Sequence, residues 1–260
     1  MIPKIIHYFW IGNNPLGVKE LKCIESWKKF CPDYELKLWN ESNYDFSKYN
    51  YSKNAFKEKK YSFATDVARL DVLYEYGGIY LDTDVEIIKP LDYLLDCEGF
   101  CGFETKSKVN TGQIIASEKG NSIIKYLLDD YLNINFYNDN GTINTTACPV
   151  IQTKALQQKG LKLNGKKQII ENFIIYPVDY FGPYNFETEK IEITDNTFSI
   201  HHYAASWYSE KDKSRHSRIV YLNTHFWLFG KIIANLYRLS YNLKDNGLKA
   251  TIKKILKKVV

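Results

Sequence analysis

Residues 76–84 read Tyr-Gly-Gly-Ile-Tyr-Leu-Asp-Thr-Asp, which is a glycine pair, a short apolar run and two carboxylates one residue apart. The apolar run predicts a buried strand, and Asp82 and Asp84 follow at its end. Mg²⁺ and Mn²⁺ prefer oxygen ligands, and sites for metal-bound phosphates commonly use one or two protein carboxylates. The stretch therefore predicts a site for a metal-bound diphosphate at the end of this strand.

The segment before the glycines, residues 63–76, predicts a helix. Apolar residues recur at helical spacing from Phe63 to Leu73, and the glycine pair is a typical helix stop. Asp66 and Arg69 are three residues apart and therefore share one face of this helix. They form either a plain ion pair or a joint site for sugar hydroxyls and a phosphate, and their spacing alone leaves both interpretations open.

The whole pattern, Ala64-x-Asp66-x-x-Arg69 followed by residues 77–84, resembles glycosyltransferase family 32, the sugar transferases with a DXD motif. The clostridial toxin glucosyltransferase domains share the core of this family. The resemblance implies a GT-A architecture, an α/β fold with a mostly parallel central sheet flanked by helices. It also implies a hexosyltransferase that uses Mn²⁺ or Mg²⁺ and a nucleotide-sugar donor, with a UDP-hexose as the first expectation.

The residues around this unit fit the same fold class. Residues 18–30 have apolar positions at helical spacing and are followed by Pro32, which closes a helix, and residues 34–39 alternate as a strand does. Strand, helix, strand and helix in this order are the βαβ rhythm of a mostly parallel sheet with helices on both faces.

The N-terminal residues 2–12 form a β-rich run in which Trp10 falls near the end of a strand, just before Gly12. Open α/β sheets place their ligands at the carboxyl ends of their strands. Trp10 is therefore either a core residue or part of a ligand site. The family resemblance favours the second interpretation, because it implies that this tryptophan stacks on the uracil of the donor.

Two later segments, residues 109–116 and 145–151, occupy positions that line the donor sugar and the acceptor in the family. Asn110 is the candidate from the first segment. The second segment departs from the family pattern, because Cys148 stands before Pro149 where the family usually has glycine.

Residues 198–207 end in a second cluster of polar and aromatic residues, and they resemble the family's closing His-His-aromatic-x-x-Ser-Trp motif. Successive strand residues point to opposite faces, so at most one of His201 and His202 points at the metal or diphosphate. By analogy with related GT-A enzymes we expect His202 to do so.

The resemblance thus implies a set of roles. The expected metal ligands are Asp82, Asp84 and His202. The residues expected at the reacting centre are Asp82, Asp84, Asp66 and Arg69. The residues expected to hold the nucleotide sugar are Trp10, Tyr80, Asp66, Arg69, Asn110, Ser206 and Trp207.

The length of 260 residues predicts one catalytic domain over residues 1–215, followed by a helical, basic extension over 216–260. The five cysteines form no CxxC pair, and no secretory signal pattern is evident, so we expect reduced thiols and a cytoplasmic setting. No run is apolar for about 18 residues, so we expect no bilayer-spanning segment.

The net charge of +5 is matched by residues 244–260 alone, where six lysines oppose Asp245 and 6 − 1 = +5. Apolar residues share one helical stripe there: Leu248, Ile252, Ile255, Leu256 and Val259. Such a helix either docks on its own domain or lies on an anionic membrane, and we expect peripheral contact with the inner face of the cell membrane. No nucleic-acid-binding motif accompanies the lysines, so we expect no nucleic-acid partner.

The expected function is transfer of a hexose, with retention of configuration, to a glycan or lipid-linked oligosaccharide in capsule, lipopolysaccharide or exopolysaccharide synthesis. One alternative is a noncatalytic scaffold that binds a nucleotide sugar or glycan, although the intact acidic and basic residues argue against it. Another is a metal phosphoesterase, which usually has a richer set of His and Asp ligands.

Overall fold

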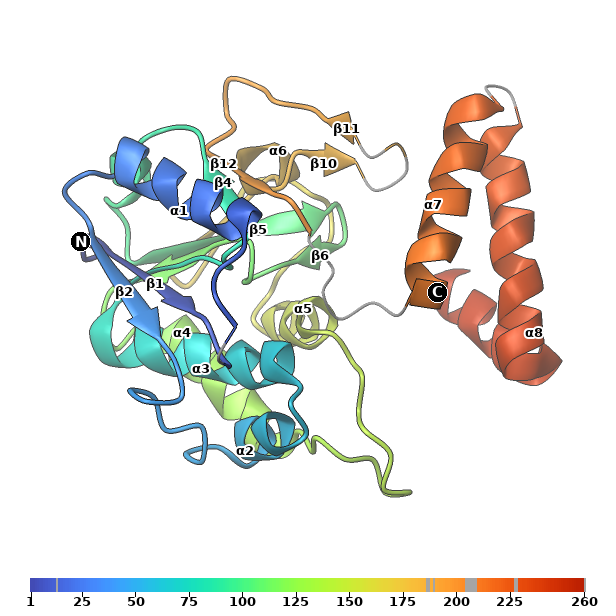
Figure 1. Ribbon diagram of the computed structural model, residues 1–260, viewed down its shortest axis with the longest axis horizontal. Helices are drawn as coiled ribbons and strands as arrows, with labels where there is room; N and C mark the ends of the chain where they lie inside the picture. Colours follow the sequence, from blue (N-terminus) through green and yellow to red (C-terminus); the bar gives the residue numbers. More distant parts are fainter. Residues whose placement is uncertain (13, 186–187, 189, 204–209, 227–228, 260) are drawn as a thin grey trace. The chain divides into compact units, whose positions relative to one another are not determined.

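The structure is a computed structural model (Figure 1), and it describes residues 1–12, 14–185, 188, 190–203, 210–226 and 229–259. It divides the chain into two compact units. The first comprises Met1–Pro183 with Glu192–Ala204, and the second comprises Tyr184–Ile191 with Ala205–Val260.

An eight-stranded sheet forms the centre of the first unit. Its order is β2 (Glu35–Trp39), β1 (Ile5–Phe9), β3 (Gly78–Tyr80), β7 (Ile115–Ser117), β5 (Gly99–Thr105), β9 (Phe173–Tyr176) and β8 (Gln168–Ile170), and β6 (Lys108–Val109) pairs with β5. β1 is parallel to β2 and β3, and β5 is parallel to β9. β7 runs antiparallel between β3 and β5, and β8 runs antiparallel at the edge. The predicted α/β fold is confirmed, with β7 as an antiparallel insertion in the middle of the sheet.

Helices cover both faces of this sheet, with α1 on one side and α3 and α4 on the other in Figure 1. The strands alternate accordingly, because Ile6 and Ile79 pack in the core beneath α1 whereas Phe9 and Tyr80 pack in the core beneath α3. The elements are α1 (Val18–Phe30), α2 (Asn50–Lys57), α3 (Tyr61–Tyr76), α4 (Ser122–Asp130), α5 (Cys148–Gln158), α6 (Val178–Phe181), and the 3₁₀ turns η1 (Leu91–Leu94) and η2 (Tyr131–Asn133).

The glycine pair ends α3 as predicted and leads directly into β3. Gly77 caps the helix with φ 67°, and Gly78 follows with φ 104°. A Cβ on Gly78 would lie 2.9 Å from Nε2 of His7 and 2.8 Å from the Ile5 carbonyl oxygen. The pair is therefore glycine because the chain turns sharply and runs close against β1.

His7 joins the strands that meet at this turn. Trp39 Nε1 donates to His7 Nδ1 at 3.0 Å, and His7 Nε2 lies 2.8 Å from the Gly77 carbonyl oxygen. Because Nδ1 accepts, Nε2 carries the proton and donates to that carbonyl. Burial lowers the pKa of His7 to about 4, so the ring is neutral at ordinary pH. One neutral imidazole thus connects β1, β2 and the start of β3.

A second, two-stranded sheet lies beyond the end of β3. β4 (Val85–Ile87) pairs antiparallel with β12 (Ser199–His201), and the register places His201 opposite Val85. The strand predicted near residue 200 therefore exists, and it ends at His201.

The second unit contains the short pair β10 (Tyr184–Asn185) and β11 (Lys190–Ile191) and the two helices α7 (Glu210–His225) and α8 (Gly230–Val259). α7 and α8 pack together, and Asp245 of α8 pairs with Lys211 at 3.1 Å and with Arg215 at 2.5 Å. Gly247 has φ 73° and interrupts α8. None of the helices in the described residues has the length and apolar character needed to cross a membrane.

Candidate active site

Asp82 and Asp84 lie in the turn that joins β3 to β4. The Asp82 N–H donates to the Gly112 carbonyl at 2.9 Å, and the Val85 N–H donates to the Asp82 carbonyl at 3.1 Å. A Cβ on Gly112 would lie 2.2 Å from Asp82 Oδ2. Gly112 is therefore required for the close approach of its loop to the first acid.

The pairing of β4 with β12 brings His201 to this turn. His201 Nε2 lies 3.1 Å from Asp84 Oδ1, although the two residues are 117 positions apart. One ligand atom from each of Asp82, Asp84 and His201 lies within 4.8 Å of the others. Carboxylate oxygens suit Mg²⁺ and Mn²⁺, and imidazole is a common metal ligand. The group fits a divalent cation, and the structure brings both predicted aspartates into it.

The side chain of His202, which was expected to meet the metal, contacts a residue outside the acidic cluster. The side chain of His202 is directed to Glu86, with Nε2 2.9 Å from Oε2, and both side chains are exposed. Strand alternation explains the difference, because adjacent residues point to opposite faces and the register of β12 turns His201 toward Asp84. Of the two histidines, His201 is therefore the one that lies beside the two acids.

Burial alone would lower the pKa of His201, but the carboxylates of Asp84, Asp82 and Glu104 raise it above its ordinary value.

A His201→Asn variant should bind Mn²⁺ at least about tenfold more weakly, because the cluster loses its nitrogen ligand. The matched His202→Asn variant should leave the affinity unchanged. Calorimetric titration of both variants with Mn²⁺ measures this, and equal affinities would contradict the assignment.

Arg69 connects the two predicted carboxylates from inside the protein. Its Nη2 lies 3.0 Å from Asp66 Oδ1 and 3.5 Å from Asp82 Oδ1, and its Nε donates to the Thr65 carbonyl at 3.2 Å. The guanidinium also lies over the ring of Tyr80, whose hydroxyl donates to Asp82 Oδ1 at 2.8 Å. Asp66 and Arg69 thus form an ion pair within α3, and it extends to the first acid of the turn.

Asp66 is the most deeply buried carboxylate of this group. Burial raises its pKa to about 7, and the positive charge of Arg69 only partly opposes this rise. The thiol of Cys148, at the start of α5, also lowers the pKa of Asp66, and it lies 3.6 Å from the Thr111 hydroxyl. The position that departs from the family pattern thus acts on the charge of Asp66.

Asn110 is held in one orientation by its neighbours. Its Oδ1 accepts from the Gly112 N–H at 2.8 Å, and its Nδ2 donates to Glu104 Oε1 at 2.8 Å. Burial raises the pKa of Glu104, which the hydrogen bond from Asn110 partly opposes. Glu104 was not among the residues predicted from the sequence. The feature of the sequence that could have indicated Glu104 is an acidic residue at the end of the apolar strand β5.

Trp10 lies directly after β1, at the same sheet edge as Asp82, because β1 and β3 are parallel with His7 opposite Tyr80. Its half-buried indole donates from Nε1 to the Asn14 carbonyl at 2.7 Å. Ser206 and Trp207 lie outside the described residues.

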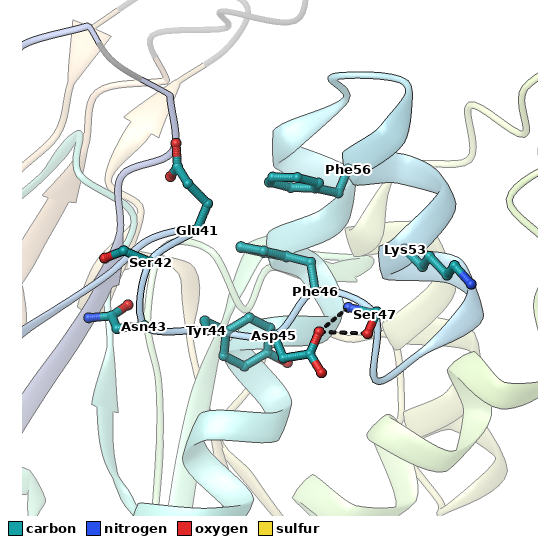
Figure 2. Close-up of a pocket in the computed structure, with 9 residues that line it drawn as sticks. All are labelled: Glu41, Ser42, Asn43, Tyr44, Asp45, Phe46, Ser47, Lys53 and Phe56. Atoms are coloured by element: carbon teal, nitrogen blue, oxygen red, sulfur yellow. Dashed lines mark hydrogen bonds between the residues drawn. The ribbon is translucent and has the colours of Figure 1, made fainter.

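An open pocket of about 600 Å³ follows β2 and was not anticipated from the sequence (Figure 2). The rings of Phe46 and Phe56 stack there with centroids 4.7 Å apart. The Glu41 carboxylate accepts from the Gly12 N–H at 3.0 Å, so the pocket borders the loop that follows Trp10. Its lining residues are Glu41, Ser42, Asn43, Tyr44, Asp45, Phe46, Ser47, Lys53 and Phe56.

Several polar groups of the interior are buried without a protein partner. Among the residues that the structure describes, the hydroxyls of Tyr51 and Tyr131 and both amide atoms of Gln152 make no hydrogen bond. A buried polar atom left in this state costs about 1–3 kcal/mol. Four such atoms would cost an amount comparable with the whole stability of a domain, which is about 5–15 kcal/mol.

Comparison with known proteins identifies the turn that holds the acids. A family model described as "Glycosyltransferase sugar-binding region containing DXD motif" matches residues 17–101. Residues 17–101 of this chain are thus similar to the DXD region of glycosyltransferases. The match includes α1, β2, α3 and the Asp82–Asp84 turn, and it confirms the resemblance to DXD glycosyltransferases that was predicted from the sequence.

Curated proteins are similar to part of this chain. "Inositol phosphoceramide mannosyltransferase 3" of Schizosaccharomyces pombe is 40% identical over 98 residues, which cover 36% of this chain and 27% of that protein. "Mannosyl phosphorylinositol ceramide synthase SUR1" of Saccharomyces cerevisiae is 36% identical over 107 residues, covering 38% of this chain and 27% of that protein. The similarity therefore spans about a quarter of each relative. The solved structure of "PaToxG Glycosyltransferase" has a TM-score of 0.46 and 22% identity, covering 61% of this chain and 69% of that one.

Proposed function

We propose that the protein transfers a hexose from a nucleotide sugar, first of all a UDP-hexose, to a hydroxyl group of a glycan. The observation that carries the proposal is the convergence of Asp82, Asp84 and His201 beside the Asp66–Arg69 pair, within a DXD glycosyltransferase region. A metal site beside the buried Asp66–Arg69 pair suits a diphosphate with a sugar attached.

Different residues are proposed to bind the diphosphate, the sugar and the base of the donor. Asp82, Asp84 and His201 would hold Mn²⁺ or Mg²⁺, which when bound supplies Lewis-acid stabilisation of charge on the leaving diphosphate. Arg69 adds a fixed positive charge on the protein side of Asp82. We propose that Asp66 accepts hydrogen bonds from sugar hydroxyls and that Trp10, at the same edge of the sheet, stacks on the base.

We further propose that the reaction retains the configuration at the anomeric carbon, as the family resemblance implies. NMR of the product distinguishes the outcomes directly. An inverted anomeric linkage would refute retention without affecting the proposal of hexose transfer.

The acceptor is proposed to be a lipid-linked glycan in the synthesis of a surface polysaccharide such as capsule, lipopolysaccharide or exopolysaccharide, at the cytoplasmic face of the membrane. The similar yeast proteins are named for mannose transfer involving inositol phosphoceramide, which is a lipid. This supports a lipid-linked acceptor and adds nucleotide-activated mannose to the donors that need testing.

Release of nucleoside diphosphate from a panel of nucleotide hexoses tests the main proposal, with Mn²⁺ and with EDTA. We expect metal-dependent release from one donor, with faster release when the correct acceptor is added. Donor binding without turnover, with candidate glycan acceptors present, would favour a noncatalytic scaffold. Phosphate release without an acceptor would indicate a phosphoesterase.

Exposed side chains of the second unit support the proposed contact with a membrane. Apolar side chains of α8 are exposed, including Leu248 at 67% and Ile252 at 46%, and the surrounding sequence is rich in lysine. A helix with exposed apolar residues and basic neighbours suits an anionic lipid surface. The side chains beyond Ile252 that complete the predicted stripe, Ile255, Leu256 and Val259, lie outside the described part of the chain.

Sedimentation of the full chain with vesicles tests this contact. We expect binding to vesicles that contain anionic lipid and weak binding to neutral ones. Leu248→Glu with Ile252→Glu should abolish binding, whereas Leu132→Glu, at an equally exposed apolar residue of the first unit, should not. Equal binding of all three proteins, or retention of binding after deletion of residues 244–260, would contradict the membrane proposal.

A further inference from the structure

Glu104 lies near the end of β5, where the pairing of that strand with β6 is irregular. The register shifts between Phe103 and Thr105, so β5 has one residue more than β6 at this point and Glu104 is part of the irregularity. Irregularities of this kind redirect side chains and are frequent beside active sites. Here the carboxylate meets a residue of the following segment, because Glu104 Oε1 accepts a hydrogen bond from Asn110 Nδ2 at 2.8 Å.

The contact with Glu104 determines which way the Asn110 amide faces. An ionised carboxylate only accepts hydrogen bonds, so the amide NH₂ group faces Glu104 and the amide oxygen faces away from it. That oxygen, Oδ1, accepts from the Gly112 N–H at 2.8 Å. If the amide turned over, Oδ1 would face the carboxylate and the NH₂ group would face an N–H, so both hydrogen bonds would be lost. Glu104 therefore also secures the bond between Asn110 and Gly112.

Gly112 joins this segment to the turn that holds the acids. Its carbonyl oxygen accepts from the Asp82 N–H at 2.9 Å. A Cβ on Gly112 would lie 2.2 Å from Asp82 Oδ2 and 2.9 Å from Arg69 Nη1. Residues 110–112 thus lie directly against the carboxylate of Asp82 and the guanidinium of Arg69, and a shift of Gly112 would displace Asp82.

We infer that Glu104 is a positioning residue that holds Asp82 in place for the metal through Asn110 and Gly112. Three consecutive hydrogen bonds of 2.8, 2.8 and 2.9 Å connect Glu104 to Asp82. Residues that orient metal ligands from behind typically contribute about 10–100-fold to metal affinity or activity. The hydrogen bonds stand independently of the proposed function, whereas their effect on metal binding rests on it.

Calorimetric titration of the full chain with Mn²⁺ tests the inference with two substitutions at Glu104. Glu104→Met has a similar length and no acceptor, so Mn²⁺ should bind at least about tenfold more weakly. Glu104→Gln lacks the charge but keeps an oxygen that can accept from Asn110, so its affinity should stay within about threefold of wild type. An unchanged affinity in Glu104→Met would overturn the inference. Equal losses in both variants would also overturn it, because the charge and not the hydrogen bond would then be responsible.

Glu98→Met is the matched control. Glu98 directly precedes β5, at the opposite end from Glu104, and its Oε1 accepts from Asn172 Nδ2 at 3.0 Å. This contact has the same chemistry, but it lies on the surface and outside the hydrogen bonds that lead to Asp82. The Mn²⁺ affinity of Glu98→Met should equal that of the wild type, and a loss as large as in Glu104→Met would contradict a specific role for Glu104.

A double-mutant cycle tests whether Glu104 acts through Asn110. Asn110→Leu removes the link between them, so adding Glu104→Met to it should weaken Mn²⁺ binding by less than about twofold further. Losses that simply add would show that Glu104 affects the metal by another route, and they would overturn the inference.

Hydrogen exchange of the metal-free full chain, followed by NMR, tests the hydrogen bonds apart from metal binding. The Asp82 amide should exchange at least about tenfold faster in Glu104→Met than in the wild type, whereas the amides of β1 and β2 should be unchanged. An unchanged Asp82 rate, or equal acceleration throughout the sheet, would overturn the inference. If the wild-type protein binds no Mn²⁺, the proposed metal site fails, and hydrogen exchange still decides whether Glu104 holds Asp82.

Discussion

The Asp84→Asn variant should lose transfer activity by about three orders of magnitude or more while its fold remains intact. Asp84 is the acid that His201 contacts, and the two side chains form the metal cluster together with Asp82. An amide has the size of the carboxylate but lacks its negative charge, so the divalent cation would lose a principal ligand. Steady-state kcat/KM for the donor at saturating Mn²⁺ measures the effect.

Glu86→Gln is the matched control for this substitution. Glu86 lies two residues further along in β4, and its carboxylate is directed to the exposed His202 instead of the cluster. We expect the control to keep at least about half of the wild-type kcat/KM, because exposed ion pairs contribute little. A kcat/KM for Asp84→Asn within tenfold of the wild-type value would exclude the proposed metal site.

The Arg69→Met variant should lose about 3–5 kcal/mol of unfolding free energy as well as its activity. The guanidinium is buried between Asp66 and Asp82, and its removal leaves the Asp66 carboxylate without a counter-charge in the interior. The loss corresponds to a fall in Tm of about 10 °C for a chain of this size. Thermal and urea unfolding measure it.

The pH dependence of this loss provides a second test. Burial has already raised the pKa of Asp66 to about 7, and Arg69 is the group that opposes the rise. Without Arg69 the pKa rises further, and an acid with a raised pKa destabilises the fold only at a pH where it would ionise in the unfolded chain. The deficit of the variant should therefore be smaller at pH 5 than at pH 8.

Lys125→Met provides the matched control for Arg69→Met. It removes an exposed cation that pairs with Asp129 one turn away on α4, so it should change the unfolding free energy by less than about 0.5 kcal/mol. Equal stability of the two variants, or a deficit that does not depend on pH, would contradict the interpretation of Arg69 as the counter-charge of a buried acid.

The sequence predicted those parts of the site that depend on neighbours along the chain. The end of α3 at the glycine pair, the buried strand β3, the acids that follow it and the shared helical face of Asp66 and Arg69 all follow from local spacing. These features depend on helical and strand periodicity and on glycine stereochemistry, which a few consecutive residues determine.

The remaining parts of the site depend on pairings between distant segments. The choice between His201 and His202 is made by the register of β12 against β4, more than a hundred residues apart in the chain. The insertion of β7 antiparallel between β3 and β5 likewise has no local signal. Glu104 also escaped prediction, because its contact with Asn110 depends on the loop that follows β5.

His7 links the order of folding to the assembly of the site. Its hydrogen bonds reach Trp39 and Gly77, which lie 32 and 70 residues further along the chain, and such long-range contacts form late in folding. Until the N-terminal strand docks, the turn after α3 lacks the imidazole that holds Gly77, and β3 lacks one of its two neighbours. We therefore expect that the side chains of Asp82 and Asp84 are not yet aligned in a nascent or partly folded chain. Affinity for metal is then acquired only at the last stage of folding.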